Sequence, residues 1–218
     1  MKEQYFTSET IEQKSKQMLE KVRKYISEQK FRFIPARSTL LVVDMQDYFI
    51  KELSHAYVPS IRTIIPRIKK LIDAYSKYNF PVIFTRHLNT KQNANLMSKW
   101  WNDLITEENP LSQISAEFDI SKGIVLKKSQ YDAFYETSLE KILREKEISQ
   151  IVICGVMTHL CCETTTRSAF IRGFEVFFTI DCTATYNENF HLSSLMNLAH
   201  GFAIPVLSNE IIKSVLRK

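Results

Sequence analysis

The chain of 218 residues has few glycines and few cysteines, four of each, and it has no long hydrophobic run. No apolar segment approaches the roughly 18 residues that a membrane span requires, so we expect no membrane partner. The polar, charged first residues do not resemble a secretory signal peptide. No internal repeat or low-complexity tract is present. Together these absences predict a soluble globular protein with enough length for a substantial core.

The four cysteines and five histidines lack the spacing that is typical of a metal site. Cys154, Cys161, Cys162 and Cys182 form no CxxC pair, and the histidines show neither HxH nor HExxH spacing. A chain of this length does not need disulfides to fold. We therefore expect a reducing, cytoplasmic environment, with no cofactor and no required metal.

The net charge of +5 is concentrated at the N-terminal end, where residues 1–37 carry nine Lys or Arg against five Asp or Glu. A basic helix can bind nucleic acid or a membrane surface. Here acidic residues are interspersed and aromatic residues are not interleaved with the basic ones, which favours a solvated helix face and no nucleic-acid partner. Residues 8–30 have a helical apolar period, so residues 1–35 are predicted to form an amphipathic helical extension. The face of that helix comprises Ile11, Met18, Leu19, Val22 and Ile26.

From residue 36 onward, short apolar runs alternate with segments of helical period. This alternation is typical of βαβ units, and it predicts that residues 36–218 form a three-layer α/β/α domain. We expect a Rossmann-like open parallel sheet of about six strands with helices on both faces. Pro66 marks either a late helix start or a kink. Residues 87–121 have no clear pattern, which is typical of a loop that covers a substrate.

Three residues whose side chains can take part in catalysis stand at the predicted ends of apolar strands: Asp44, Lys128 and Cys161. In an open parallel sheet, ligands bind beyond the carboxyl ends of the strands. Cys161 follows a turn at Gly155 and begins a helix, where the helix dipole favours a thiolate. A nucleophilic thiol needs a nearby cation to lower its pKa and a base to take its proton. Lys128 and Asp44 fit these two roles.

Three sequence strings also carry a family resemblance over residues 36–210. They are DMQDYF from Asp44, KSQYDAF from Lys128 and GVMTHLCCETTTRSAF from Gly155. The chain resembles the isochorismatase-like hydrolase superfamily, which includes nicotinamidases, N-carbamoylsarcosine amidases and isochorismatases. The amidases of this superfamily resemble one another in the motif GVxTxxC, whose nucleophilic cysteine matches Cys161 of this chain. True isochorismatases resemble GVxAHxGC, whose cysteine matches Cys162.

The resemblance implies a role for each of these residues. Asp44 would accept the thiol proton and return it to the leaving amine, while Lys128 would stabilise the thiolate of Cys161. Backbone N–H groups of Cys161 and Met157 would hold the oxyanion, and the Val156–Met157 peptide would be cis. Water would then hydrolyse a thioester. Family members commonly form homodimers or homotetramers, so we expect a homo-oligomer acting on a small molecule.

Other residues are candidates for the substrate pocket or for packing. Cys154, Cys162 and Cys182 are interpreted as small hydrophobes. In isolation, Asp44 and Lys128 could equally be solvated charges at loop ends. Nicotinamidases resemble one another in a metal site built on an Asp-x-His segment. The corresponding segment of this chain, FTRHLNT, contains no Asp-x-His. The predicted pocket residues are Gln46, Phe49, His87, Trp101, Tyr131, Phe134 and His159.

Three functions remain open at this level. The leading hypothesis is a cysteine amidohydrolase that cleaves the C–N bond of a small amide or carbamoyl compound. The alternative is hydrolysis of an enol ether such as isochorismate, with Asp44 as general acid; DMQDYF, His159 and residues 187–195 favour it. Isochorismatases hold a substrate carboxylate with an arginine, and residues 87–121 contain none. The third possibility is a non-catalytic scaffold or binding protein.

Overall fold

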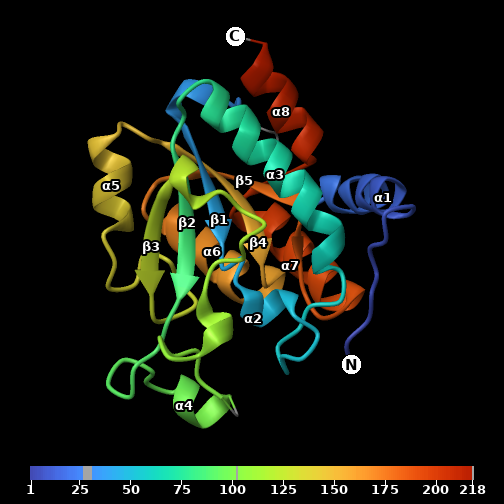
Figure 1. Ribbon diagram of the computed structural model, residues 1–218. Coiled ribbons are helices and arrows are strands. Elements are labelled where there is room, and N and C mark those ends of the chain that lie inside the picture. Colours follow the sequence, from blue (N-terminus) through green and yellow to red (C-terminus); the bar gives the residue numbers. More distant parts are fainter. Residues whose placement is uncertain (27–30, 102, 218) are drawn as a thin grey trace.

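Six parallel strands form the centre of the protein in the computed structural model, which describes residues 1–26, 31–101 and 103–217 (Figure 1). They lie in the order β3-β2-β1-β4-β5-β6, and every neighbouring pair is parallel. This order is that of a doubly wound sheet. The strands are β1 Ser38–Val43, β2 Val82–His87, β3 Ile124–Lys128, β4 Gln150–Val156, β5 Glu175–Ala184 and β6 Ile204–Val206.

Helices cover both faces of this sheet, as the sequence predicts. On one face α3 packs against α8, and on the other α6 packs against α7 (Figure 1). The three-layer α/β/α fold is therefore confirmed. The α-helices are α1 Ile11–Arg23, α2 Asp47–Ile50, α3 Ile61–Lys77, α4 Met97–Trp100, α5 Leu139–Glu145, α6 Glu163–Ile171, α7 Glu188–Gly201 and α8 Ser208–Leu216.

The apolar runs form strands because both faces of the sheet are covered. All six residues of β1 and all seven of β4 are buried. A strand buried on both faces has no polar alternation, and continuous runs of Val, Ile and Leu are typical of it. The edge strand β3 differs, since Ile124 and Val125 are exposed.

Two expectations about helices need correction. Helix α1 ends at Arg23 rather than near residue 30, and residues 27–30 lie outside the described residues. Pro66 is not a helix start, because α3 begins five residues earlier at Ile61 and continues through it. The eight buried residues of α3 hold the helix on the sheet despite the N–H group that proline lacks.

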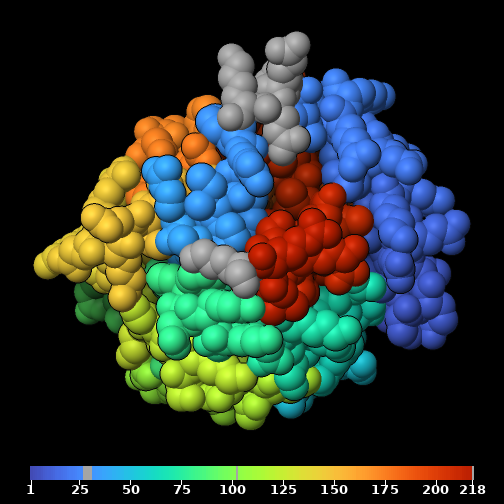
Figure 2. Space-filling model, turned by 90° about the horizontal axis from the view of Figure 1, so that it is seen from above, coloured from blue at the N-terminus to red at the C-terminus, as the bar shows by residue number. Residues whose placement is uncertain are grey.

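The two ends of the sheet carry different structures. Figure 2 shows the end where the strands begin, and there α8 lies beside α3. The strands point toward the opposite end, where α2, α4 and the loop between β2 and β3 lie (Figure 1). Among the described residues, no helix is both long and apolar enough to cross a membrane.

Candidate active site

The candidate site lies where the strand order reverses, between β1 and β4. Connections from these two neighbouring strands leave in opposite directions, which opens a crevice at their carboxyl ends. Asp44 follows β1 directly, and the turn that carries Cys161 follows β4. Lys128 is the last residue of β3. The sheet thus brings together the three residues that the sequence singles out.

The turn after β4 depends on a glycine. Gly155 has φ of 113°, and a Cβ atom there would lie 2.1 Å from the carbonyl oxygen of Val43. Only glycine permits this close approach of β4 to β1. The peptide bond between Val156 and Met157 is cis, as the resemblance implies. Cys161 then lies in a π-helical turn, Thr158–Cys162, which leads into α6.

Asp44 and Lys128 form a fully buried ion pair. Asp44 Oδ2 lies 2.7 Å from Lys128 Nζ, and both side chains have no exposed surface. The hydroxyl of Thr85 donates to Asp44 Oδ1 at 2.6 Å. Asp44 has φ of 48°, an uncommon conformation for a residue other than glycine. A buried charge pair of this kind requires close partners, and the surrounding strands provide them.

The same ammonium group also contacts the thiol and an imidazole. Lys128 Nζ lies 3.4 Å from Cys161 Sγ and 3.3 Å from His87 Nδ1. Ligand atoms of Asp44, His87 and Cys161 all lie within 4.8 Å of one another, a grouping that could hold a metal ion. The Lys128 ammonium already contacts all three of these side chains. A metal ion bound there would have to displace this ammonium.

The charge state of the thiol differs from the sequence expectation. Burial raises the pKa of Cys161, the Lys128 ammonium opposes this shift, and the Asp44 carboxylate adds to it. Burial alone would also raise the pKa of Asp44, but Lys128 holds that pKa below its ordinary value. The expectation of a lowered thiol pKa is therefore wrong. These two shifts favour a neutral Cys161 thiol beside an ionised Asp44 carboxylate.

His87 is neutral and fixed between two partners. Burial and the charge of Lys128 lower the pKa of His87 to about 4. Its Nδ1 accepts from the ammonium, so Nε2 carries the proton and donates to Asn89 Oδ1 at 2.9 Å. Gln46 fixes the backbone of His87: its amide accepts from the His87 N–H at 2.8 Å and donates to the His87 carbonyl at 3.0 Å.

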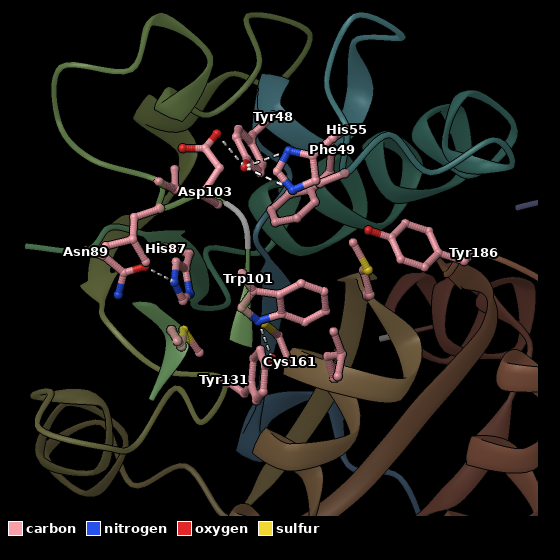
Figure 3. Close-up of a pocket in the computed structure, with 16 residues that line it drawn as sticks. Tyr48, Phe49, His55, His87, Asn89, Trp101, Asp103, Tyr131, Cys161 and Tyr186 are labelled. Carbon is pink, nitrogen blue, oxygen red and sulfur yellow. Dashed lines mark hydrogen bonds between the residues drawn. The ribbon is translucent and has the colours of Figure 1, made fainter. Parts of the chain in front are cut away.

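A cavity lined largely by apolar and aromatic side chains opens over Cys161 (Figure 3). Ligand pockets are usually lined in this way. The indole of Trp101 donates to the hydroxyl of Tyr131 at 2.7 Å. Lys128 and Asp44 do not line the cavity themselves. They lie behind Cys161 and His87, which do line it. The aromatic lining residues are Tyr48, Phe49, Trp101, Tyr131 and Tyr186.

Three polar side chains, those of Tyr48, His55 and Asp103, lie across the cavity from Cys161. The hydroxyl of Tyr48 donates to Asp103 Oδ2 at 3.1 Å and lies 3.4 Å from Nδ1 of the His55 ring (Figure 3). These residues come from α2, from the loop after it and from the loop between β2 and β3. The expectation that residues 87–121 cover a substrate agrees with this placement, since Met97, Trp101 and Ile105 also line the cavity.

Several predicted pocket residues lie elsewhere. Gln46 is fully buried behind His87. Phe134 stacks on Phe174 in the core. His159 accepts from or donates to the Thr185 hydroxyl at 2.6 Å and stacks on a phenylalanine of α7. Phe49, His87, Trp101, Tyr131, Met157 and Cys161 do line the cavity.

Sequence reasoning missed other lining residues. Tyr48 belongs to the DMQDYF string and stands beside the predicted Phe49, so a helical reading of that string could have found it. Asn89 stands two residues after His87, the last residue of β2, and a strand that continued to Asn89 would place both side chains on one side. His55 and Tyr186 come from loops whose composition gives no signal.

Comparison with known proteins gives consistent matches. Residues 38–210 match the family model of the Isochorismatase domain. Nicotinamidase 3 of Arabidopsis thaliana is 36% identical over 184 residues, which cover 82% of this chain and 89% of that protein. Enterobactin synthase component B of Escherichia coli (strain K12) is 30% identical over 83% of this chain and 64% of that protein. The structure of a cysteine hydrolase from Pseudomonas syringae pv. phaseolicola 1448A superposes with a TM-score of 0.79 at 25% identity, covering 86% of this chain and 96% of that chain.

Proposed function

This chain belongs to the isochorismatase family of hydrolases, and we propose that it cleaves the C–N bond of a small amide or carbamoyl compound through a thioester on Cys161. One observation carries this proposal. Lys128 Nζ contacts the Asp44 carboxylate and the Cys161 thiol at once, and that thiol lines the cavity. A base, a cation and a nucleophile within contact of one another are the groups that covalent catalysis requires.

Acylation begins from the neutral thiol. As Cys161 Sγ attacks the carbonyl carbon, its proton passes to the Asp44 carboxylate, which is ionised because Lys128 lowers its pKa. The ammonium then stands beside the developing thiolate. Collapse of the tetrahedral intermediate breaks the C–N bond, and Asp44 returns the proton to the departing nitrogen. Ammonia or an amine leaves, and the acyl group stays on Sγ.

Deacylation uses the same groups in reverse. Water attacks the thioester carbonyl, Asp44 takes a proton from that water, and the proton returns to Sγ when the C–S bond breaks. A carboxylic acid is released and the free thiol is restored. In both steps, backbone N–H groups of Met157 and Cys161 are the proposed oxyanion donors, since both residues line the cavity.

Hydrolysis of an enol ether would require Asp44 to act as a general acid rather than as a base. A general acid must be protonated before the reaction, whereas the Lys128 ammonium holds the pKa of Asp44 below its ordinary value. The arrangement therefore favours Asp44 as a base. A binding protein without catalysis would not need a buried base, cation and thiol in contact, because such buried charges destabilise the fold when imperfectly paired.

The proposal is tested by assaying ammonia release from a panel of small aromatic and aliphatic amides, beginning with nicotinamide, by wild type, Cys161→Ala and Cys162→Ala. We expect Cys161→Ala to lose turnover by about 10⁶-fold, the loss seen when the nucleophile of a serine protease is removed. Cys162 is also fully buried but does not line the cavity, so Cys162→Ala should retain turnover. Pyruvate release from isochorismate by Cys161→Ala, with no amide cleaved by the wild type, would overturn the proposal in favour of the enol ether.

A further inference from the structure

The chain starts near the end of the molecule that holds the cavity, and its first residues run from there along the side of the molecule to α1 (Figure 1). We call residues 1–6 the N-terminal strap. It lies outside the matched family region of residues 38–210. Tyr5 and Phe6 are buried, with exposed fractions of 4% and 0%, so the strap is anchored in the core rather than lying on the surface.

The strap joins two loops that line the cavity. The ammonium of Lys2 donates to the carbonyl oxygen of His55 and lies 4.6 Å from the centre of the Tyr186 ring. The backbone N–H of Glu3 donates to the carbonyl oxygen of Tyr186 at 2.8 Å. His55 and Tyr186 both line the cavity, although they come from separate loops. In the described residues, Lys2 contacts both of them.

Tyr5 extends these contacts toward the nucleophile. Its hydroxyl accepts from the backbone N–H of Thr185 at 3.1 Å and lies 3.1 Å from Nδ1 of His191. The same nitrogen of His191 lies 3.0 Å from the hydroxyl of Thr158, which opens the turn that carries Cys161. Thr185 directly precedes Tyr186. A buried chain of polar contacts thus runs from the strap to both the cavity wall and the nucleophile turn.

We propose that the N-terminal strap is part of the substrate site, with Lys2 and Tyr5 as positioning residues that set the width of the cavity and therefore the size of substrate it accepts. Lys2 holds the ring of Tyr186 and the backbone of His55 at a fixed separation. Tyr5 holds the backbone before Tyr186. Neither residue touches the reacting atoms. Loss of either contact lets the wall move outward, so that larger molecules reach Cys161.

The test compares alkylation of Cys161 by two reagents that share one reactive group, 2-chloroacetamide and N-benzyl-2-chloroacetamide. Labelling is followed by the mass of the Cys161 peptide, and the other three cysteines are fully buried. We expect Lys2→Met to raise the rate with the benzyl reagent relative to the small one by about two- to fivefold, as expected for loss of one cation–π contact. Lys14→Met is the matched control, because Lys14 pairs with Glu188 nearby but contacts no cavity residue.

A second pair of variants separates position from stability. Tyr5→Phe keeps the buried ring but removes the hydroxyl contacts. Tyr75→Phe does the same at a buried tyrosine that bonds to Ser38 at the other end of the sheet. With thermal unfolding measured for both, only Tyr5→Phe should shift the ratio of alkylation rates. An unchanged ratio in Lys2→Met and Tyr5→Phe, or an equal shift in the two controls, would overturn the proposal. Because the readout needs no turnover, it does not depend on amide hydrolysis.

Discussion

The two halves of the candidate site are built in different ways. The inner half consists of Asp44, His87, Lys128 and Cys161, which stand at or just after the ends of four neighbouring strands and are at most 5% exposed. The outer half consists of Tyr48, His55, Asp103 and Tyr186, which come from α2 and three loops. His55 and Asp103 are exposed. The sheet therefore positions the inner half, whereas loops, joined in our proposal by the N-terminal strap, position the outer half of the cavity.

This difference predicts how each half responds to substitution. In the inner half, every charge is desolvated, so removal of one partner leaves the other buried without compensation. In the outer half, water can replace a lost partner, and exposed polar contacts contribute little. Variants of the inner half should change both activity and stability, and variants of the outer half should mainly change substrate affinity.

After Cys161→Ala, the largest expected effect is that of Asp44→Asn. Removal of a general base typically costs about 10²–10⁴ in rate, and asparagine cannot accept the thiol proton. The control is Asp181→Asn, since Asp181 is a second buried carboxylate, paired with Arg67 at 3.0 Å but away from the cavity. We expect kcat to fall only for Asp44→Asn. Equal losses of kcat in the two variants would mean that the inner half is not distinguished by its chemistry.

Lys128→Met should combine a loss of activity with a loss of stability. It leaves the Asp44 carboxylate buried without its cation, which costs about 3–5 kcal/mol in comparable buried pairs. Urea unfolding measures this change. The double variant Asp44→Asn with Lys128→Met should recover much of the stability while remaining inactive. A double variant no more stable than Lys128→Met would show that the ion pair is not the source of the loss.

Acid should destabilise the protein partly through His87 of the inner half, and His191, whose pKa burial lowers to about 3, contributes over the same range of pH. The folded protein keeps His87 neutral down to about pH 4, because burial and Lys128 lower its pKa, whereas an unfolded chain protonates histidine near ~6.5. As pH falls through this window, the unfolded state binds the proton first, so stability present at pH 7 is lost between about 6.5 and 4. The loss is about 1.4 kcal/mol per pH unit for one histidine.

Urea unfolding at several pH values in this window checks the acid prediction. His87→Gln should reduce the slope of stability against pH by that amount. His55→Gln, at an exposed position of the outer half, is the matched control. The prediction fails if wild type and His87→Gln lose stability in parallel.

The smallest effect is expected for Asp103→Asn. Asp103 is exposed and accepts one hydrogen bond from Tyr48, so its loss should change stability by less than about 1 kcal/mol. It should change KM while leaving kcat nearly constant, because Asp103 lies across the cavity from Cys161 (Figure 3). Steady-state kinetics with neutral and cationic amides measure this. A fall in kcat as large as that of Asp44→Asn would remove the distinction between the halves.

The same division explains what the sequence could predict. Continuous apolar runs locate the strands, and parallel strands place their final residues together, so Asp44, Lys128 and Cys161 could be grouped before any coordinates were known. The direction in which the pKa of the Cys161 thiol shifts could not be predicted, because it depends on how completely the site excludes water. Nor could His55 and Tyr186 be found, since their placement depends on loop paths and on long-range contacts from Lys2.

The central claim is that the inner half acts through an acyl group on Cys161. The most direct measurement is the intact mass of the enzyme, quenched in acid during turnover of the best amide substrate, followed by peptide mapping. We predict a mass increase equal to the acyl group of that amide, located on the Cys161 peptide and removed by hydroxylamine. Full turnover with no adduct in wild type, together with undiminished activity of Cys161→Ala, would contradict the account.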